Sequence, residues 1–162
     1  MMTLGYWRRD EATVQSRRGL WFHSGDLARF DDEGFVTFVG RMSDSLRRRG
    51  ENISAYELEA VMNGAPNVRE SAAVPVVDAV GGEDEIKVFV VPGSDTFDAD
   101  EFFAYCEAHL PRFALPLYLE LTDDSQLTRS VGSGVIQKQG LSRDCSGPGV
   151  IRRPSARKES TR

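Results

Sequence analysis

Cysteine and histidine are scarce in this sequence, with two residues of each among 162. Cys106 and Cys145 lie far apart, so they give no disulfide framework and fit a reducing compartment. His23 and His109 show no metal-ligand spacing, and we predict no metal site. No apolar run approaches membrane-spanning length, and the first residues show no signal-peptide pattern. We therefore expect a soluble, cytoplasmic protein.

Lysine is nearly as scarce, since only Lys87, Lys138 and Lys158 are found among the 20 basic residues. Any chemistry that needs a lysine therefore has few candidates. Residues 143–162 hold six basic and two acidic side chains, so they carry +4 of a net charge of −5 and the remainder carries −9. An acidic folded part argues against nucleic acid as a partner. The tail itself lacks apolar area, so we expect 143–162 to be a disordered basic segment.

In contrast to these scarce residue types, glycine, arginine and helix-capping residues are concentrated between Gly40 and Ser54. This stretch holds a Gly-Arg pair, the lone acid Asp44, three consecutive arginines, a second glycine and a helix-start signal. Guanidinium groups bind phosphates bidentately and keep their charge at any physiological pH, so the pattern favours a site that handles phosphates. The alternative is a solvated basic loop that leads into a helix, and for Arg47 and Arg48 the two interpretations are equally supported.

The remaining pattern alternates short strands with two helices. Ser54 and Glu57 have the spacing of a capping box, and Asp98 and Glu101 repeat it, each before residues with an apolar helical period. Cys106 falls on the apolar face of the second helix, which predicts that it is buried. Runs rich in branched and aromatic residues predict strands, and these runs are 20–22, 27–30, 35–39, 68–77, 86–91 and 117–121. Pro75 places its strand at an edge or near a strand end.

The stretch from Gly40 to Ser54 resembles the hinge motif of the adenylate-forming enzymes, the superfamily of acyl-CoA synthetases, luciferase-like enzymes and peptide-synthetase adenylation domains. Gly5-Tyr6-Trp7 with Glu11-Ala12-Thr13 resembles a segment inside their large domain, and the similarity runs from Gly5 to Leu141. The resemblance implies an α+β fold, a small antiparallel sheet with flanking helices, preceded by strands left over from the large amino-terminal domain. The implied domains are 1–40, from the large AMP-binding domain, 41–142, the carboxy-terminal lid, and the tail.

Several site residues follow from the resemblance by position. Ser24-Gly25-Asp26 is similar to a Thr-Gly-Asp motif whose carboxylate binds the ribose hydroxyls of ATP, although Ser-Gly-Asp is also an ordinary turn. The resemblance further implies that Arg41 contacts the nucleotide and that Asp44 is the hinge. It also assigns a loop beside the CoA tunnel, formed by Arg47, Arg49, Gly50 and Glu51.

The resemblance breaks at the catalytic lysine. The family motif is a Gly-Lys pair followed by a stretch like Ile-Gln-Lys, whereas here Gly134 precedes Val135 and Ile136-Gln137-Lys138 then resume the pattern. Lys138 matches the second, non-catalytic lysine. In an extended segment residues 135 and 138 point to opposite faces, so Lys138 does not replace the missing ammonium without a local slip.

The implied activity is that of an acid–CoA ligase, which uses ATP with Mg to form an acyl-adenylate, releases AMP and transfers the acyl group to CoA. The sequence is most similar to carnitine–CoA ligases and ligases of short acids. Because the glycine-, serine- and threonine-rich phosphate loop of the family is absent, we expect a carboxy-terminal fragment that is inactive alone and whose partner is the large AMP-binding domain. The alternatives are a non-catalytic nucleotide- or partner-binding module and the remnant of a decayed gene.

Overall fold

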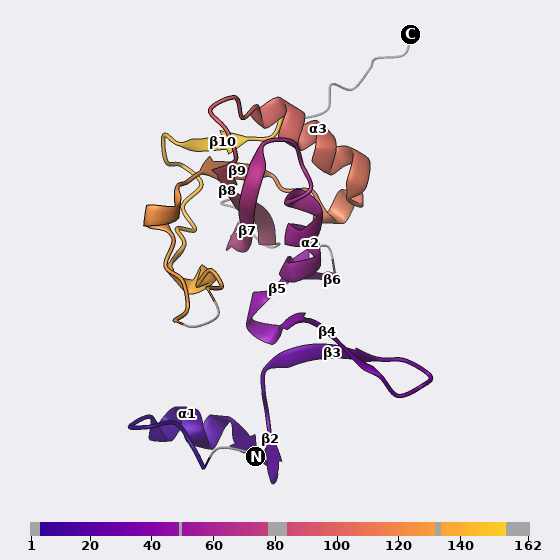
Figure 1. Cartoon of the computed structure of the whole chain (residues 1–162), viewed down its shortest axis with the longest axis vertical. Coiled ribbons are helices and arrows are strands. Elements are labelled where there is room, and N and C mark those ends of the chain that lie inside the picture. Colours follow the sequence, from indigo (N-terminus) through magenta and orange to yellow (C-terminus); the bar gives the residue numbers. More distant parts are fainter. Residues whose placement is uncertain (1–3, 49, 78–83, 132–133, 155–162) are drawn as a thin grey trace. The chain divides into compact units, whose positions relative to one another are not determined.

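The computed structural model describes residues 4–48, 50–77, 84–131 and 134–154, and the chain divides into two compact units, Met1–Ser43 and Asp44–Arg162 (Figure 1). Each unit holds its own sheets, since strand pairing in the described residues joins strands of the same unit. The units are therefore described separately.

The first unit contains one helix and two short hairpins. Helix α1 (Asp10–Gln15) precedes strands β1 (Arg17–Arg18) and β2 (Trp21–Phe22), and β3 (Asp26–Phe30) pairs with β4 (Val36–Arg41). Strands β2, β3 and β4 lie where the apolar runs predicted them, whereas α1 and β1 were not predicted.

The turn between β3 and β4 follows from its residues. The carboxylate of Asp31 accepts hydrogen bonds from the backbone N–H groups of Glu33 (3.0 Å) and Phe35 (2.8 Å). Gly34 adopts φ +87°, a conformation that side chains with a Cβ rarely adopt. The chain therefore reverses at the predicted position.

This first unit has almost no core of its own. Gly40 is its single buried residue within the described range 4–43. Most of its large apolar side chains are exposed to at least 38% of their area, among them Leu4, Trp7, Leu20, Trp21, Phe22, Phe30, Phe35, Val36, Phe38 and Met42. Exposed apolar surface of this extent is typical of a segment that packs against another body.

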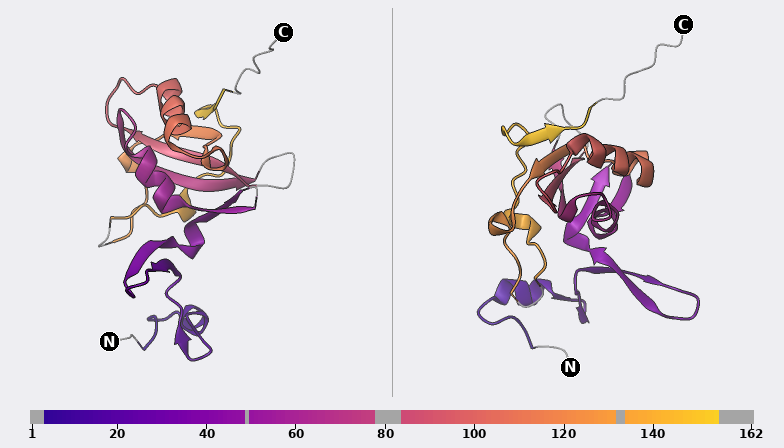
Figure 2. Two further views of the ribbon diagram at one scale, coloured as in Figure 1. Left: turned by 90° about the vertical axis from the view of Figure 1, so that its right-hand side faces the viewer. Right: turned by 45° about the horizontal axis from the view of Figure 1, so that its top comes forward.

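The second unit is built on a four-stranded sheet in the order β10-β9-β8-β7 (Figure 2). Its strands are β7 (Val68–Val77), β8 (Asp84–Pro92), β9 (Tyr118–Leu121) and β10 (Val150–Arg152). The pairs β7–β8 and β9–β10 are antiparallel, and β8–β9 is parallel because α3 (Ala99–His109) crosses over between them. The predicted α+β class with a small sheet and flanking helices is confirmed, with one parallel pair at the centre of the sheet.

Before the sheet, the hairpin of β5 (Ser45–Arg48) and β6 (Glu51–Ser54) leads into α2 (Ala55–Met62). Single helical turns occur along the chain at η1 (Met42–Asp44), η2 (Arg112–Ala114), η3 (Asp124–Gln126) and η4 (Lys138–Gly140). The hydroxyl of Ser54 accepts from the N–H of Glu57 at 3.3 Å, and Asp98 accepts from the N–H groups of Asp100 and Glu101. Both predicted helix starts are confirmed.

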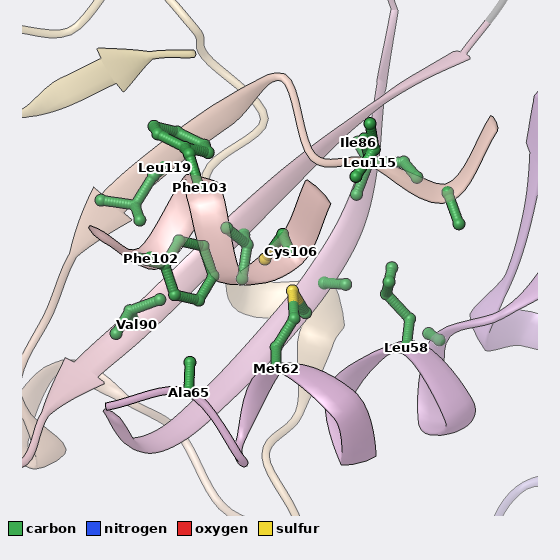
Figure 3. Close-up of a cluster of buried hydrophobic side chains, with 14 of the residues drawn as sticks. Leu58, Met62, Ala65, Ile86, Val90, Phe102, Phe103, Cys106, Leu115 and Leu119 are labelled. Atoms are coloured by element: carbon green, nitrogen blue, oxygen red, sulfur yellow. The ribbon is translucent and has the colours of Figure 1, made fainter. Parts of the chain in front are cut away.

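The sheet of the second unit is buried on both faces. On one face α2 and α3 pack against it, and Figure 3 shows Met62 and Cys106 pointing toward each other there, with Phe102 beside Val90. Burial raises the pKa of the Cys106 thiol to about 12. The other face carries a second apolar cluster, made of Ala72, Val74, Val76, Phe89, Val91, Leu127 and Ile136, with Leu141 and Cys145 packed against it. Two-sided burial explains why the apolar run of β8 is nearly continuous.

The predicted disorder of 143–162 is wrong for its first part. Val150–Arg152 forms β10, which pairs with β9, and the N–H of Arg153 donates to the carbonyl of Leu117 at 2.8 Å. The free edge of β9 supplies backbone partners for this segment, a source of stability that composition does not reveal. Residues 155–162 lie outside the described residues. Pro75 lies on β7, an edge strand, as predicted.

Lys87 attaches this carboxy-terminal segment to the sheet. Its ammonium is fully buried, pairs with Glu120 at 2.7 Å and donates hydrogen bonds to the carbonyls of Ser142 and Asp144. The same ammonium lies 4.7 Å from the ring centre of Phe89. A buried charge needs this full set of partners, so the one polar residue that interrupts the apolar run of β8 is the anchor of the tail.

We expect the two units to differ in backbone protection. The amides of β3 and β4 should exchange with solvent far faster than those of Ile86–Val91, because the first unit lacks a buried core. Hydrogen exchange followed by NMR on the 162-residue chain measures both. Equal protection of the two segments would show that residues 4–43 are stable without further packing.

We expect Lys87→Met to loosen the segment 142–152 and to lower the free energy of unfolding by on the order of 2 kcal/mol, because charged hydrogen bonds are lost and Glu120 loses its partner. Limited proteolysis and urea unfolding measure the two effects. The matched double variant Lys87→Met/Glu120→Gln should recover part of the stability. Unchanged proteolysis of the tail in Lys87→Met would contradict the anchoring role.

Candidate functional site

The two residues predicted to bind nucleotide, Asp26 and Arg41, face each other across β3 and β4. They are register partners at the end of the hairpin, and the Nε atom of Arg41 lies 3.0 Å from Oδ1 of Asp26. Arg41 also donates to the carbonyl of Ser24 at 3.2 Å. The pair is exposed, so it contributes little to stability and its groups remain accessible to a ligand.

The turn before Asp26 combines both predicted interpretations. The N–H of Asp26 donates to the hydroxyl of Ser24 at 3.2 Å, which is a local turn contact. Gly25 has φ +75°, and a Cβ built on it meets no atom within 4 Å, so the backbone here is open. The ion pair with Arg41 uses one oxygen of Asp26, and an ionised carboxylate has further acceptor positions on the other. The geometry therefore suits a ligand that offers hydroxyl donors.

The predicted CoA-tunnel loop is the tip of the β5–β6 hairpin. Arg48 pairs with Glu51 in the ladder, and Gly50, directly before Glu51, adopts φ +80°. Arg47, Gly50 and Glu51 are exposed at this tip. Arg49 lies outside the described residues.

The consecutive arginines do not share one environment, because successive side chains of a strand point to opposite faces. Arg47 is exposed, whereas Arg48 is buried with 4% of its area accessible. Its guanidinium donates to the carbonyls of Leu115 (2.7 Å) and Phe113 (3.3 Å) and pairs with Glu85 at 2.6 Å. For Arg48 the solvated alternative is therefore wrong. The alternation of the strand was the sequence signal that could have separated Arg48 from Arg47.

Val135, which the resemblance places at the family lysine, lies on a carboxy-terminal hairpin whose described residues are 128–131 and 134–137. Arg129 bridges Ile136, and the N–H of Gln137 donates to the carbonyl of Thr128 at 2.8 Å. Val135 is 62% exposed, whereas the neighbouring Ile136 is buried. The exposed side of this hairpin thus carries an isopropyl group where the family motif has an ammonium.

The carboxy-terminal hairpin is attached to β7 by a set of ion pairs that the sequence did not reveal. The guanidinium of Arg129 binds both carboxylate oxygens of Glu70, at 3.1 and 2.6 Å, and also contacts Asp124. The hydrogen bond from Arg129 lowers the pKa of Asp124. Arg69 pairs with Asp124 at 2.6 Å and extends the set. Arg69 and Glu70 lie far from Asp124 and Arg129 in sequence, so only the fold brings the two pairs together.

Lys138 is engaged in a second cluster, with Glu59 of α2 and the predicted hinge residue Asp44. Its Nζ atom lies 2.7 Å from Oε1 of Glu59 and 3.9 Å from Oδ2 of Asp44, and its side chain is 14% exposed. The Lys138 ammonium thus lies between two carboxylates and is mostly buried, whereas the side chain of Val135 is exposed. That Lys138 does not replace the missing lysine stays a prediction.

Glu59 is the titratable group of this cluster with a shifted pKa. Burial raises its pKa above 4.5, and the nearby Lys138 ammonium and the N–H of Ala73 oppose that rise. The Ala73 N–H donates to Oε1 of Glu59 at 2.6 Å, the same oxygen that faces Lys138. Glu59 was not singled out from the sequence, because it lies among the ordinary polar positions of a helix.

Within the part of the chain that the structure describes, no three histidine, cysteine or acidic side chains are grouped so as to hold a metal ion. No helix among the described residues is both long and apolar enough to cross a bilayer.

Residues 57–131 match the family described as the AMP-binding enzyme C-terminal domain. The chain is also similar to the crotonobetaine/carnitine–CoA ligase of Citrobacter koseri, with 36% identity over 135 residues that cover 82% of this chain and 26% of that ligase. A ligase of the same name from Escherichia coli is 37% identical over 119 residues, which cover 73% and 22%. The chain thus spans about a quarter of the length of the curated relatives it matches.

Solved structures of similar fold agree with these relatives. The ATP-bound structure of MatB from Rhodopseudomonas palustris matches with a TM-score of 0.70 and 31% identity, covering 84% of this chain and 27% of that one. O-succinylbenzoate Coenzyme A synthetase from Bacillus subtilis, in complex with AMP, matches with a TM-score of 0.68 and 28% identity, covering 82% and 26%.

We expect Glu59 to make stability depend on pH. Because its pKa is higher in the folded than in the unfolded chain, the folded state binds the proton more tightly. The free energy of unfolding should therefore fall as pH rises from 4.5 through the raised pKa, and the cost of ionised Glu59 is complete above it. Urea unfolding over a pH series should show this slope, and Glu59→Gln should remove it.

The matched control for this measurement is Glu57→Gln, an exposed residue of the same helix, which should keep the slope. Lys138→Met should raise the pKa of Glu59 further, because an opposing charge is removed, and a carboxyl NMR titration would detect the change. An unchanged slope in Glu59→Gln would show that other groups produce the pH dependence.

Proposed function

This chain belongs to the adenylate-forming (AMP-binding) enzyme superfamily, and we propose that it serves as the mobile carboxy-terminal domain of an AMP-forming acid–CoA ligase. The observation that carries the proposal is the place where the two compact units divide, between Ser43 and Asp44. Asp44 is the residue that the hinge resemblance selected, close to the domain boundary expected at 40/41. The division of the chain into two compact units at the same point supports rotation there.

The proposed reaction has two steps. A carboxylic acid attacks the α-phosphate of ATP, with Mg, to give an acyl-adenylate and pyrophosphate, and the thiol of CoA then displaces AMP. Support comes from relatives named as CoA ligases and from similar structures solved with ATP or AMP. The names of the curated relatives favour a carnitine-type or other short acid as substrate.

Each site residue takes a role within that reaction. Asp26 and Arg41 would bind the nucleotide, the carboxylate through the ribose hydroxyls and the guanidinium through its charge, and their accessible pairing supports this. Asp44 would be the hinge. The tip of the β5–β6 hairpin, with Arg47, Gly50 and Glu51, would lie beside the pantetheine of CoA, and its exposure supports this. Arg49 is assigned to the same loop by sequence alone.

We propose that the large AMP-binding domain is the partner of this chain, whether it is encoded in the same polypeptide or separately. The exposed apolar side chains of residues 4–43 support a partner of that kind, because they lack a buried core in the described structure. A second candidate function, a non-catalytic nucleotide- or partner-binding module, is favoured by one observation, the replacement of the family lysine by Val135.

We expect the 162-residue chain alone to show no acid-dependent release of pyrophosphate, because it lacks the family's phosphate loop. Incubation with short acids, ATP, Mg and CoA measures this, and a candidate large-domain chain added to a parallel reaction tests complementation. Robust turnover by the pure chain would contradict the role of a domain that needs a partner.

With a complementing large domain, we expect Val135→Lys to raise the adenylation rate by up to about a hundredfold, because one positioned charge at the transition state is worth that much. The exposed side chain of Val135 leaves room for the longer residue. Thioester formation from a preformed acyl-adenylate should hardly change. The matched control is Val131→Lys, an exposed valine of the same segment.

The two half-reactions are measured separately, by pyrophosphate release and by AMP release from the preformed adenylate. An equal effect on both would show that Val135 does not occupy the catalytic position. The absence of any effect on adenylation would favour the non-catalytic module.

A further inference from the structure

We infer that Lys138 is a positioning residue that holds the hinge segment at Asp44 and the Val135 hairpin in register on α2. Its consequence for catalysis rests on the function proposed above, but the coupling itself is a property of this chain. This lysine is distinct from the family's catalytic one, and the proposed reaction gives neither Lys138 nor Glu59 another role.

The cluster has a fixed side and an adjustable side. Glu59 is the fixed side, because its Oε1 atom accepts from the Ala73 N–H at 2.6 Å and faces Lys138 at 2.7 Å, so α2 and β7 both hold it. Asp44 is the adjustable side, since its carboxylate is 3.9 Å from the ammonium and 33% exposed. Lys138 is therefore held by the fixed carboxylate of Glu59 while its ammonium also faces the hinge segment at Asp44.

Backbone connections tie Lys138 to the hairpin. It is the first residue of η4, and the preceding Gln137 donates to the carbonyl of Thr128 at 2.8 Å. Ile136 anchors the same segment in the second apolar cluster. Any shift of the hairpin that carries Val135 must therefore displace the ammonium that faces Asp44.

The charges of the cluster determine which part would move if the ammonium were removed. One ammonium stands between two carboxylates, and Asp44 is near enough to Glu59 to oppose its ionisation. With glutamine in place of Lys138, the two carboxylates would repel each other in a partly buried site, where solvent screens charges only weakly. Since Glu59 is held by the Ala73 N–H, the hinge segment is the part that would move.

The test compares Lys138→Gln with Lys138→Arg and with Arg143→Gln, an exposed arginine that controls for the change of net charge. Hydrogen exchange of the 162-residue chain is followed at Ser45 and Leu46, at 136–139 and, as an internal reference, at Val88–Val90. Lys138→Gln should speed exchange at the first two segments about fivefold, the equivalent of one partly exposed ion pair. Lys138→Arg and Arg143→Gln should stay close to the wild type.

A second variant separates positioning from simple loss of structure. In Asp44→Asn/Lys138→Gln the repulsion is removed, so protection at Ser45 and Leu46 should return while 136–139 stays fast. Failure of this recovery, or equal effects of Lys138→Gln and Lys138→Arg, would overturn the inference. Neither measurement uses ATP, CoA or a large domain, so a failure of the proposed ligase function would leave these outcomes unaffected and distinguishable.

Discussion

The burial of β7 and β8 on both faces is the constraint on which the second unit depends. Such strands expose no apolar surface to water only if two separate layers cover them. Helices α2 and α3 cover one face, and the carboxy-terminal hairpin with the segment around Leu141 and Cys145 covers the other. The second layer contains little regular structure, so its position needs specific attachments.

Cations supply those attachments at three places. Lys87 holds the tail, Arg129 holds the hairpin on Glu70, and Lys138 holds the end of the hairpin on Glu59. Each pairs with a carboxylate on the sheet or on α2, and each is at least partly buried, where ion pairs fix geometry more than they add stability. Two of the three lysines in the chain are thus used to position this second layer.

The contrast with residues 4–43 bears directly on function. That unit presents the pair Asp26–Arg41 on a hairpin whose aromatic side chains are exposed, whereas the second unit is stabilised by its own core. A self-contained domain joined at Asp44 to a segment that needs further packing is the arrangement expected of a lid that moves relative to a larger body.

Local sequence patterns were sufficient to predict the structural features that depend on neighbouring residues in the chain. The caps at Ser54 and Asp98, the turn at Gly34, strands β7 to β9 and the helical period that buries Cys106 all follow from short-range propensity and period. The motif from Gly40 to Ser54 likewise identified the family. Tertiary structure alone decided that Arg48 meets Glu85 and the carbonyl of Leu115, that the tail adds β10, and that Lys87, Arg129 and Lys138 meet their carboxylates. These outcomes join residues separated by long stretches of chain, and the burial that gives each charge its partner exists only once the sheet has formed.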